Sequence, residues 1–361
     1  MSATFKQSTP QLSHLDPLEQ TALTKLKTKA NHAFVTGAGG FLGKAICKRL
    51  LAAGIKVTGF ARGNYPELSA MGVNMIRGDI ADQACVTAAM KGCDLVFHVA
   101  SKAGVWGSKM SYFSPNVAGA ANIILACRQL AITNLVYTST PSVTFAGKDE
   151  SGIDETAPYA AKYLNYYGES KAVAEQMVLG ANTDSLKTVA LRPHLIWGPE
   201  DPHLVPRVIE RAKAGRLKLV GKEDKLVDTI YVDNAAFAHI LAALNLFEPG
   251  SVAAGKAYYL SNDEPITMAD MLNRILACVD MPKVTKRVPA SLAFCVGVVL
   301  ETLYSLMNKQ EEPMMTRFVA RQLSTSHYFN ITAAKTDFGY SPVVSIDQGM
   351  VKLKKYLNRS H

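Results

Sequence analysis

The stretch Thr36-Gly37-Ala38-Gly39-Gly40-Phe41-Leu42-Gly43 constrains the fold most strongly, because it joins an apolar stretch at residues 33–36 to helically spaced apolar residues at 41–53. Glycines at 37, 40 and 43 suit a tight turn, a close approach of backbone to pyrophosphate, and close packing of helix on strand. The amides of Phe41, Leu42 and Gly43 would then receive phosphate oxygens at the start of the helix. The sequence therefore predicts a strand-turn-helix unit that binds a dinucleotide.

The pattern of alternating strands and helices continues for about 160 residues after this turn. Further apolar strands are expected at residues 56–61, 74–76, 95–99, 135–139 and 188–192, with helical segments between them. Such alternation predicts an α/β fold with a doubly wound parallel sheet, whose ligand lies over the carboxyl ends of the strands.

Three parts are expected along the chain. Residues 1–30 form an N-terminal extension, in which Asp16-Pro17-Leu18-Glu19 starts a helix. This helix is expected to pack through Leu18, Ala22 and Leu26 on the domain surface, with an arm that docks on a partner as the alternative. Residues 31–195 form the dinucleotide-binding domain. Residues 196–361 form a smaller, mainly helical substrate-binding part, with segments that return to the sheet.

The end of the second strand indicates which cofactor is used. Ala61 is followed by Arg62, whereas an acidic residue there would hold the free ribose hydroxyl of NAD. A guanidinium suits the additional phosphate of NADP, so NADP(H) is expected ahead of NAD(H), although an arginine can also simply stack on adenine. Asp79 and Ile80, after the third strand, are expected at the adenine edge.

A second motif concerns proton transfer. Tyr167 and Lys171 lie four residues apart in Tyr167-Gly168-Glu169-Ser170-Lys171, so a helix would place both on one face. A fixed ammonium, with the positive charge of an oxidised nicotinamide, would bring a phenol pKa from about 10 towards neutrality. The alternative for such a common spacing is a solvated helical pair.

Composition excludes several classes of protein. The chain is 48% hydrophobic and 19% charged, which fits a soluble enzyme, and its net charge of +9 is spread along the chain apart from Lys352-Leu353-Lys354-Lys355. Nucleic-acid binding is therefore not expected. Six scattered cysteines without a C-x-x-C pair or a signal peptide predict reduced thiols in a cytoplasmic protein. The eight histidines show no metal-ligand spacing, so no metal is expected.

Residues 288–307 are nearly all apolar and long enough to cross a membrane. Ser291, Gly297, Glu301, Thr302 and Ser305 interrupt this stretch. A buried or substrate-covering helix is therefore expected, with contact to a membrane surface as the alternative.

Taken together, the glycine-rich turn, Tyr137-Thr138-Ser139-Thr140 at a strand end and Y-x-x-x-K resemble the extended short-chain dehydrogenase/reductases. Leu191-Arg192-Pro193-His194 and Leu260-Ser261-Asn262-Asp263-Glu264-Pro265 are similar to the 3β-hydroxysteroid dehydrogenase branch, which includes sterol 4-carboxylate 3-dehydrogenases. Ala103-Gly104-Val105-Trp106-Gly107-Ser108 and Thr138-Ser139-Thr140-Pro141-Ser142-Val143 resemble bacterial 2-alkyl-3-ketoalkanoate reductases of long-chain olefin biosynthesis.

This resemblance implies NADPH-dependent reduction of the 3-keto group of a long-chain 2-alkyl-3-oxo fatty acid. Tyr167 is then the general acid, and Lys171 holds the nicotinamide ribose and lowers the phenol pKa. Thr140 donates to the substrate oxygen where most relatives carry Ser, and Ser139 and Ser142 are substitutes.

The resemblance also implies supporting residues. Asn116 would support the site from a helix beneath it, or be an ordinary helix residue. Ala100, Ser101 and Pro193 would line the cofactor ribose. His98 and His194 are expected as polar lining groups.

For the substrate, Arg317 and Arg321 are the candidate cations, ahead of Arg207, and Trp106 and Ser139 are counted with the substrate site. Residues 288–307 and Met314-Met315 would supply apolar wall. A homodimer, and contact with other olefin-pathway enzymes, follow from kinship alone. The alternatives are a sterol 4-carboxylate 3-dehydrogenase that works in the oxidative direction and a non-catalytic NADP sensor, for which Tyr167 would have no purpose.

Overall fold

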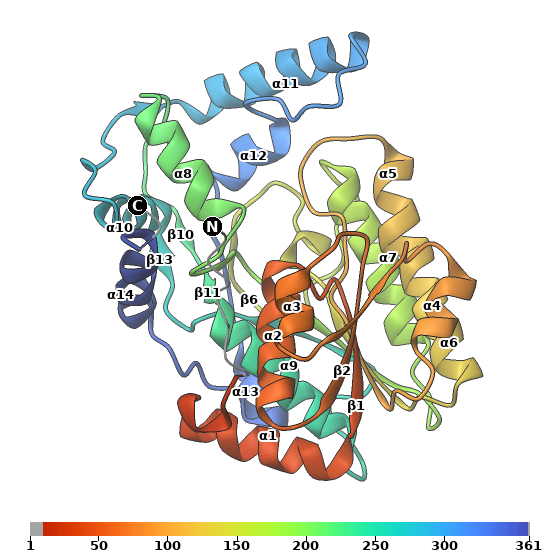
Figure 1. Ribbon diagram of the computed structural model, residues 1–361. Helices are drawn as coiled ribbons and strands as arrows, with labels where there is room; N and C mark the ends of the chain where they lie inside the picture. The colour runs from red at the N-terminus through yellow and green to blue at the C-terminus, as the bar shows by residue number, and fades with distance from the viewer. Residues whose placement is uncertain (1–9, 360–361) are drawn as a thin grey trace, which may run out of the picture.

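A seven-stranded parallel sheet forms the centre of the molecule in the computed structural model, which describes residues 10–359 (Figure 1). Its order is β12-β7-β5-β4-β1-β2-β3, so the chain reverses direction across the sheet between β1 and β4. The strands are β1 (His32–Thr36), β2 (Lys56–Ala61), β3 (Asn74–Arg77), β4 (Leu95–His98), β5 (Asn134–Thr138), β7 (Lys187–Pro193) and β12 (Lys256–Leu260). The predicted α/β fold with a doubly wound parallel sheet is confirmed, and the reversal point is where such sheets bind ligands.

Helices cover both faces of this sheet, and each face has its own apolar core. On one face lie α2 (Phe41–Ala52) and α9 (Val232–Leu246), with α3 (Pro66–Ala70) at the β3 edge. On the other lie α4 (Gln83–Ala89), α6 (Gly119–Gln129) and α7 (Tyr166–Gly180), with α5 (Lys109–Phe113) beside them. Because neighbouring residues of a buried strand point to opposite faces, Phe34 packs in one core and Val35 in the other.

The helix α1 (Pro17–Lys29) packs against α9, outside the sheet. Asp16 caps it, as the sequence predicts, and the structure adds a capping box with Glu19. Leu23 and Leu26 are fully buried, whereas Leu18 is 57% exposed, so its expected place in the packed face is wrong. Of the predicted extension at 1–30, residues 1–9 lie outside the described residues.

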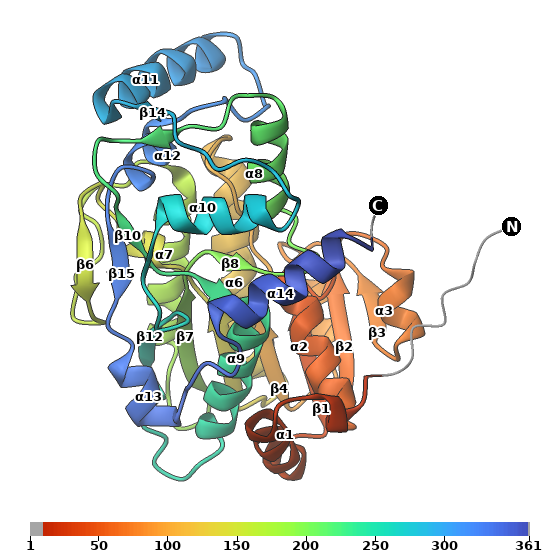
Figure 2. The same ribbon diagram turned by 90° about the vertical axis from the view of Figure 1, so that its left-hand side faces the viewer.

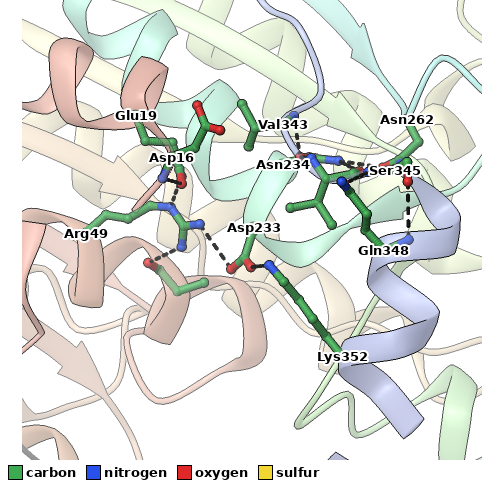
Figure 3. Close-up of polar contacts among 12 residues, drawn as sticks. Asp16, Glu19, Arg49, Asp233, Asn234, Asn262, Val343, Ser345, Gln348 and Lys352 are labelled. Carbon is green, nitrogen blue, oxygen red and sulfur yellow. Dashed lines mark hydrogen bonds and ion pairs between the residues drawn. The ribbon is translucent and has the colours of Figure 1, made fainter. Parts of the chain in front are cut away.

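Charged side chains fasten α1 to the rest of the molecule (Figure 3). The buried Arg49 guanidinium pairs with Glu19 at 2.6 Å and with Asp233 of α9 at 3.0 Å. Lys352 of α14 (Ile346–Leu357) reaches the same Asp233 at 3.6 Å. In the same view, Asn234 accepts from the amides of Val343 and Val344, which ties the chain before α14 to α9.

The remaining elements gather beyond the carboxyl ends of the strands and along one side of the sheet (Figure 2). A four-stranded sheet has the order β13 (Ile266–Thr267), β10 (Leu226–Val227), β15 (His327–Phe329), β6 (Glu150–Ile153). Two short pairs join β11 (Ile230–Tyr231) to β8 (Ile196–Trp197) and β14 (Arg287–Val288) to β9 (Leu219–Val220). The helices here are α8 (Leu204–Lys213), α10 (Met268–Ala277), α11 (Ala290–Leu306), α12 (Arg317–Gln322) and α13 (Thr332–Phe338).

The apolar stretch at 288–307 forms α11, which lies on the outside of the molecule at the end opposite α1 (Figures 1 and 2). Only Ala293 and Gly297 of this helix are buried, so the expectation of a buried helix is wrong, whereas that of a substrate-covering helix stays a prediction. Apolar character therefore does not indicate burial in this segment. Across residues 10–359, we find no helix with the length and apolar content needed to cross a membrane.

Candidate active site

The glycine-rich turn joins β1 to α2 beside the end of β4. Gly37 has a φ of +65°, and a Cβ there would lie 2.9 Å from the Cα of Ala100. A Cβ at Gly43 would lie 2.2 Å from the carbonyl oxygen of Gly37. Glycine is therefore required at both positions, once for the turn and once for the close contact between helix and turn.

This turn suits the diphosphate of a dinucleotide. The first intrahelical bond of α2 runs from the amide of Lys44 to the carbonyl of Gly40, at 2.9 Å. The amides of Phe41, Leu42 and Gly43 precede it in the first turn of the helix, where backbone donors have no intrahelical acceptor. The turn thus combines free donors, the positive end of the helix dipole and a backbone that a phosphate can approach closely.

Two arginines lie at the ends of the neighbouring strands β2 and β3. Arg77 Nε donates to the carbonyl oxygen of Arg62 at 2.9 Å, which holds the two residues side by side. Both are exposed, and within residues 10–359 neither has a carboxylate within ion-pair distance. Asp79 accepts from the amide of Ala81 at 2.9 Å, and Ile80 is buried beneath it.

Tyr65 is a residue of this region that sequence reasoning missed. Its ring lies so close to the turn that a Cβ at Gly39 would come within 2.2 Å of it, and its hydroxyl lies 2.9 Å from where a Cβ of Gly63 would be. Arg77 was missed as well. No spacing in the sequence connects a tyrosine after β2, or an arginine at the end of β3, with the turn after β1.

Tyr167 lies in the first turn of α7, next to Thr140, which follows the end of β5 by two residues. Burial raises the pKa of Tyr167 above its usual value of 10.0, and a hydrogen bond with the Thr140 side chain opposes that rise. Thr140 is itself 8% exposed and accepts from the amide of Ser142 at 3.2 Å. The fold thus brings phenol and hydroxyl together, while the buried hydroxyl of Ser139 has no partner among the described residues.

Lys171 is 1% exposed, and its Nζ donates to the carbonyl oxygen of Thr138 at 2.6 Å. The same ammonium lies 4.1 Å from the centre of the Tyr137 ring. Burial lowers the pKa of Lys171 to about 7, with Glu175 opposing that fall. The chain alone therefore differs from the expectation of a Tyr167 pKa near neutrality, because desolvation raises the pKa of the phenol and Lys171 is not among the groups that act on it.

Buried polar atoms without partners surround Lys171. In the described part of the chain, His98 Nε2 and the Tyr137 hydroxyl have no hydrogen-bond partner, and the two rings lie 5.3 Å apart. Burial and the Lys171 charge lower the pKa of His98 to about 3, so its imidazole is neutral. Such atoms usually find a partner, which suits a polar ligand beside Lys171.

Asn116 connects two parts of the site. It lies in a π-helical turn between α5 and α6, is 1% exposed, and donates to Ser170 Oγ at 2.9 Å. Its side-chain oxygen accepts from the amide of Lys102 at 2.7 Å. It therefore joins the loop after β4, which holds Ala100 and Ser101, to the residue before Lys171.

Glu175 is a further residue that the sequence did not reveal. It lies one turn after Lys171, is fully buried, and pairs with Arg192 of β7 through contacts of 2.5 and 3.0 Å. Tyr159 donates to the same carboxylate at 2.8 Å. Pro193, expected at the cofactor ribose, follows Arg192 and ends β7.

The substrate candidates are spread over two regions. Trp106 Nε1 donates to the carbonyl of Lys309 at 3.0 Å, and its ring meets Tyr304 of α11 edge-on. Arg317 pairs with Glu301 at 2.6 Å and Arg207 with Glu312 at 3.0 Å, so both charges already have partners.

Arg321 differs from the other two candidate cations. Its guanidinium lies 4.6 Å from the centre of the Phe294 ring, and within residues 10–359 it has no ion-pair partner.

His194 is not a free lining group, because its Nε2 and His327 Nδ1 share a buried hydrogen bond of 2.6 Å. No cluster of three metal-ligating side chains is found among the described residues.

Comparison with known sequences gives consistent matches over most of the chain. A sequence model of the 3-beta hydroxysteroid dehydrogenase/isomerase family matches residues 34–288. The 2-alkyl-3-oxoalkanoate reductase of Shewanella oneidensis is 68% identical over 350 residues, which cover 95% of this chain and 90% of that relative. The reductase of the same name from Stenotrophomonas maltophilia is 50% identical, over 89% of this chain and 97% of its own. The decarboxylating sterol-4-alpha-carboxylate 3-dehydrogenase of Mus musculus is 34% identical, over 91% of this chain and 92% of its own.

Solved structures share the fold at lower identity. The crystal structure of gox2253 matches with a TM-score of 0.74 and 24% identity, over 91% of this chain and 98% of its own. MoeE5, solved with UDP-glucose and NAD, matches with a TM-score of 0.69 and 21% identity, over 91% and 99%. The arrangement of strands and helices is thus shared with these solved proteins.

Proposed function

The chain belongs to the 3-beta hydroxysteroid dehydrogenase/isomerase family, and we propose that it reduces the 3-keto group of a long-chain 2-alkyl-3-oxoalkanoate to a hydroxyl with NADPH. The observation that carries this proposal is its likeness to the Shewanella oneidensis reductase along nearly the whole chain. The site supplies the chemistry that this reaction needs, namely a proton donor, an oxyanion donor and a dinucleotide turn.

Tyr167 acts as the general acid. When bound, the cofactor supplies the hydride that reaches the ketone carbon. Tyr167 gives its proton to the oxygen that becomes the alcohol, and Thr140 donates a hydrogen bond to the same oxygen as charge develops there. Because burial raises the pKa of Tyr167, the phenol is protonated at neutral pH, which is the form that reduction requires.

Lys171 is proposed to hold the cofactor ribose. Its buried ammonium adjoins polar atoms that lack partners, and hydroxyl groups of a ribose could accept from it. Asn116 acts as a positioning residue, because it links the loop after β4 to the turn of α7 that carries Lys171.

NADPH is proposed rather than NADH because positive charge gathers where the adenine ribose belongs. Arg62 follows β2, and the Arg77 guanidinium donates to its backbone carbonyl, so both basic residues lie at the same end of the sheet. A 2′-phosphate would be paired there, whereas a free ribose hydroxyl would leave both charges without an anion.

Arg321 is the proposed partner of the substrate carboxylate. The competing arginines already pair with glutamates, whereas Arg321 lies on Phe294 and close to Gly147. Gly147 follows the segment that begins with Thr140, so a keto acid with its carbonyl at Thr140 could extend towards this guanidinium.

The test is NADPH oxidation, followed at the nicotinamide absorbance, with a 2-alkyl-3-keto acid or with a short 3-keto acid. We expect turnover with the long substrate and a loss of about a hundredfold to ten-thousandfold in Tyr167→Phe. NADPH binding, followed by nicotinamide fluorescence, should be unchanged in this variant. Turnover that survives in Tyr167→Phe would remove the proposed acid.

The second candidate is oxidation and decarboxylation of a 4-carboxysterol, since a relative of that name covers nearly the whole chain. That reaction begins from a β-hydroxy acid and needs Tyr167 as a phenolate, which the raised pKa disfavours. Turnover of a 4-carboxysterol with NAD, without turnover of the keto acid, would establish this candidate instead.

A homodimer and association with other enzymes of olefin synthesis complete the proposal, both from the kinship with these reductases. Sedimentation velocity of the purified chain tests the first, and co-purification with the neighbouring pathway enzymes tests the second.

A further inference from the structure

The outer surface of α11 carries an apolar stripe. Its members Leu292, Val296, Val299, Leu303 and Leu306 follow one another at three- and four-residue intervals, so they lie along one side of the helix. Their exposed fractions run from 41% to 79%. Over 17 residues the helix is about 26 Å long, so the stripe is a continuous apolar ridge rather than a scatter of single side chains.

The inner side of the same helix is firmly attached. A Cβ at Gly297 would lie 2.7 Å from the backbone of Thr316, so α11 and the start of α12 are in close contact. Glu301 accepts from both the amide and the side chain of Arg317, each at 2.6 Å. The helix is therefore held in place by its inner side and the stripe stays outside, which indicates an interaction surface.

Positive charge is concentrated in the part of the chain that carries this ridge. Residues 204–225 and 283–322, which contain α8, β9, β14, α11 and α12 and are called the outer lobe below, hold 13 basic and 6 acidic residues. That net of +7 compares with +9 for the whole chain, so the rest of the molecule is close to neutral. The sequence shows the excess as scattered, and the fold gathers it at one end.

The helix α8 brings several of these charges together next to an exposed methionine. Arg211 donates to the carbonyl oxygen of Met314 at 3.1 Å, and Met314 is 59% exposed. Burial first, and then Arg207 and Arg216, lower the pKa of Arg211, while Glu312, the ion-pair partner of Arg207, opposes that fall. The three guanidinium groups therefore repel one another, and this one carboxylate offsets only part of the repulsion. An anion beside α8 would relieve this repulsion.

We propose that the outer lobe docks on the surface of an anionic lipid bilayer, with the α11 stripe among the acyl chains and the basic residues of α8 against lipid phosphates. An apolar ridge with cations beside it is the arrangement by which helices lie in a membrane interface. Such docking would bring the protein to a hydrocarbon phase in which a two-chain keto acid dissolves.

A second copy of the chain is a poorer occupant of this surface. Two such lobes that faced each other would bring +7 against +7 across the contact, and like charges oppose association. An anionic bilayer supplies an apolar phase for the ridge and phosphate groups for the cations.

The experiment is sedimentation of the full-length protein with vesicles of phosphatidylglycerol and phosphatidylethanolamine, and with vesicles of phosphatidylcholine alone. Val299→Asp tests the stripe, and Leu18→Asp on α1 is its matched control, because these side chains are 56% and 57% exposed. Lys213→Gln with Arg216→Gln tests the charge, and the exposed pair Lys25→Gln with Lys29→Gln on α1 is the control. Thermal unfolding and NADPH binding show that each variant is folded.

We expect binding to the anionic vesicles that is about tenfold or more weaker in Val299→Asp and falls about fivefold for each of the two cations removed at Lys213 and Arg216. Salt at about 0.5 M should weaken it, and the α1 variants should bind as the parent does. Equal binding to phosphatidylcholine, or equal losses in the α1 variants, would overturn the proposal. A dimer in the absence of vesicles that Val299→Asp dissociates would also overturn it, because the stripe would then cover a second copy.

Discussion

Replacement of Lys171 by methionine should change how the stability of the cofactor-free protein depends on pH. Lys171 is 1% exposed, and burial lowers its pKa from the usual 10.5 to about 7. The folded protein therefore binds fewer protons than the unfolded chain between these two pH values. Wherever the unfolded state binds more protons, the free energy of unfolding rises with pH.

The size of the effect follows from the two pKa values. At about 1.36 kcal/mol per pH unit, burial of the charged lysine costs roughly 5 kcal/mol below about pH 7. Between about pH 6.5 and pH 9.5 the penalty falls by roughly 3 kcal/mol, because the folded protein has lost the proton and the unfolded chain has not. Methionine has nearly the same length and no proton, so the variant lacks this contribution at every pH.

Urea unfolding, followed by the fluorescence of the fully buried Trp197, measures the free energy of unfolding. The wild type minus Lys171→Met difference should rise by roughly 3 kcal/mol across this pH range, since other titrating groups cancel in the subtraction. Lys171→Arg keeps the charge and serves as the control, with a deficit that does not recover at high pH. A difference that is flat with pH, or that falls as pH rises, would refute the buried, deprotonating Lys171.

Three other substitutions test separate parts of the structure. Arg62→Asp should weaken NADPH binding by about tenfold to a hundredfold, because a charge-assisted hydrogen bond is lost, and should leave NADH bound more tightly than NADPH by nicotinamide fluorescence. Arg49→Met should lower the free energy of unfolding by about 3–5 kcal/mol near neutral pH, because the buried Glu19 carboxylate loses its partner and Asp233 keeps only Lys352. That loss should shrink as the pH falls, because burial raises the pKa of Glu19 and its unpaired carboxylate then takes up a proton, and a loss independent of pH would contradict it. Glu175→Gln should destabilise by a similar amount, because Arg192 keeps its buried charge without a partner. It should also move the pH profile of turnover to lower pH through Lys171, whereas a purely structural role for Glu175 would leave that profile in place.

The sheet could be predicted from the sequence because its signals are local. A buried parallel strand is a short apolar run, and the strand at residues 56–61 was predicted with the bounds that β2 has. The geometry of the glycine-rich turn could likewise be predicted from its residues, since only glycine tolerates the contacts at Gly37 and Gly43. Strand order, by contrast, depends on crossovers and is expected from the fold class rather than from any residue.

The site was predicted less completely, because its groups come from separate strands and helices. Tyr167 and Thr140 could be connected by the order of the motifs, but their hydrogen bond depends on how α7 crosses the end of β5. The effect of burial on Lys171 depends on Tyr137 and Thr138, which surround it, and helical spacing cannot show that enclosure. Glu175 reads as an ordinary helical acid until Arg192 is placed beside it.

The apolar segment at 288–307 shows why a pattern can predict a helix and still mistake its environment. Burial follows from what lies on each side of a helix, and hydropathy reports only what the helix itself carries. Ala293 and Gly297 have small side chains, and they are buried because small residues allow close contact with α12. The large side chains, such as Val299, stay outside, where the fold has no further layer to cover them. The net charge is likewise not informative from sequence alone. The ridge and the cations of α8 indicate a binding surface only once the fold places them at one end of the molecule.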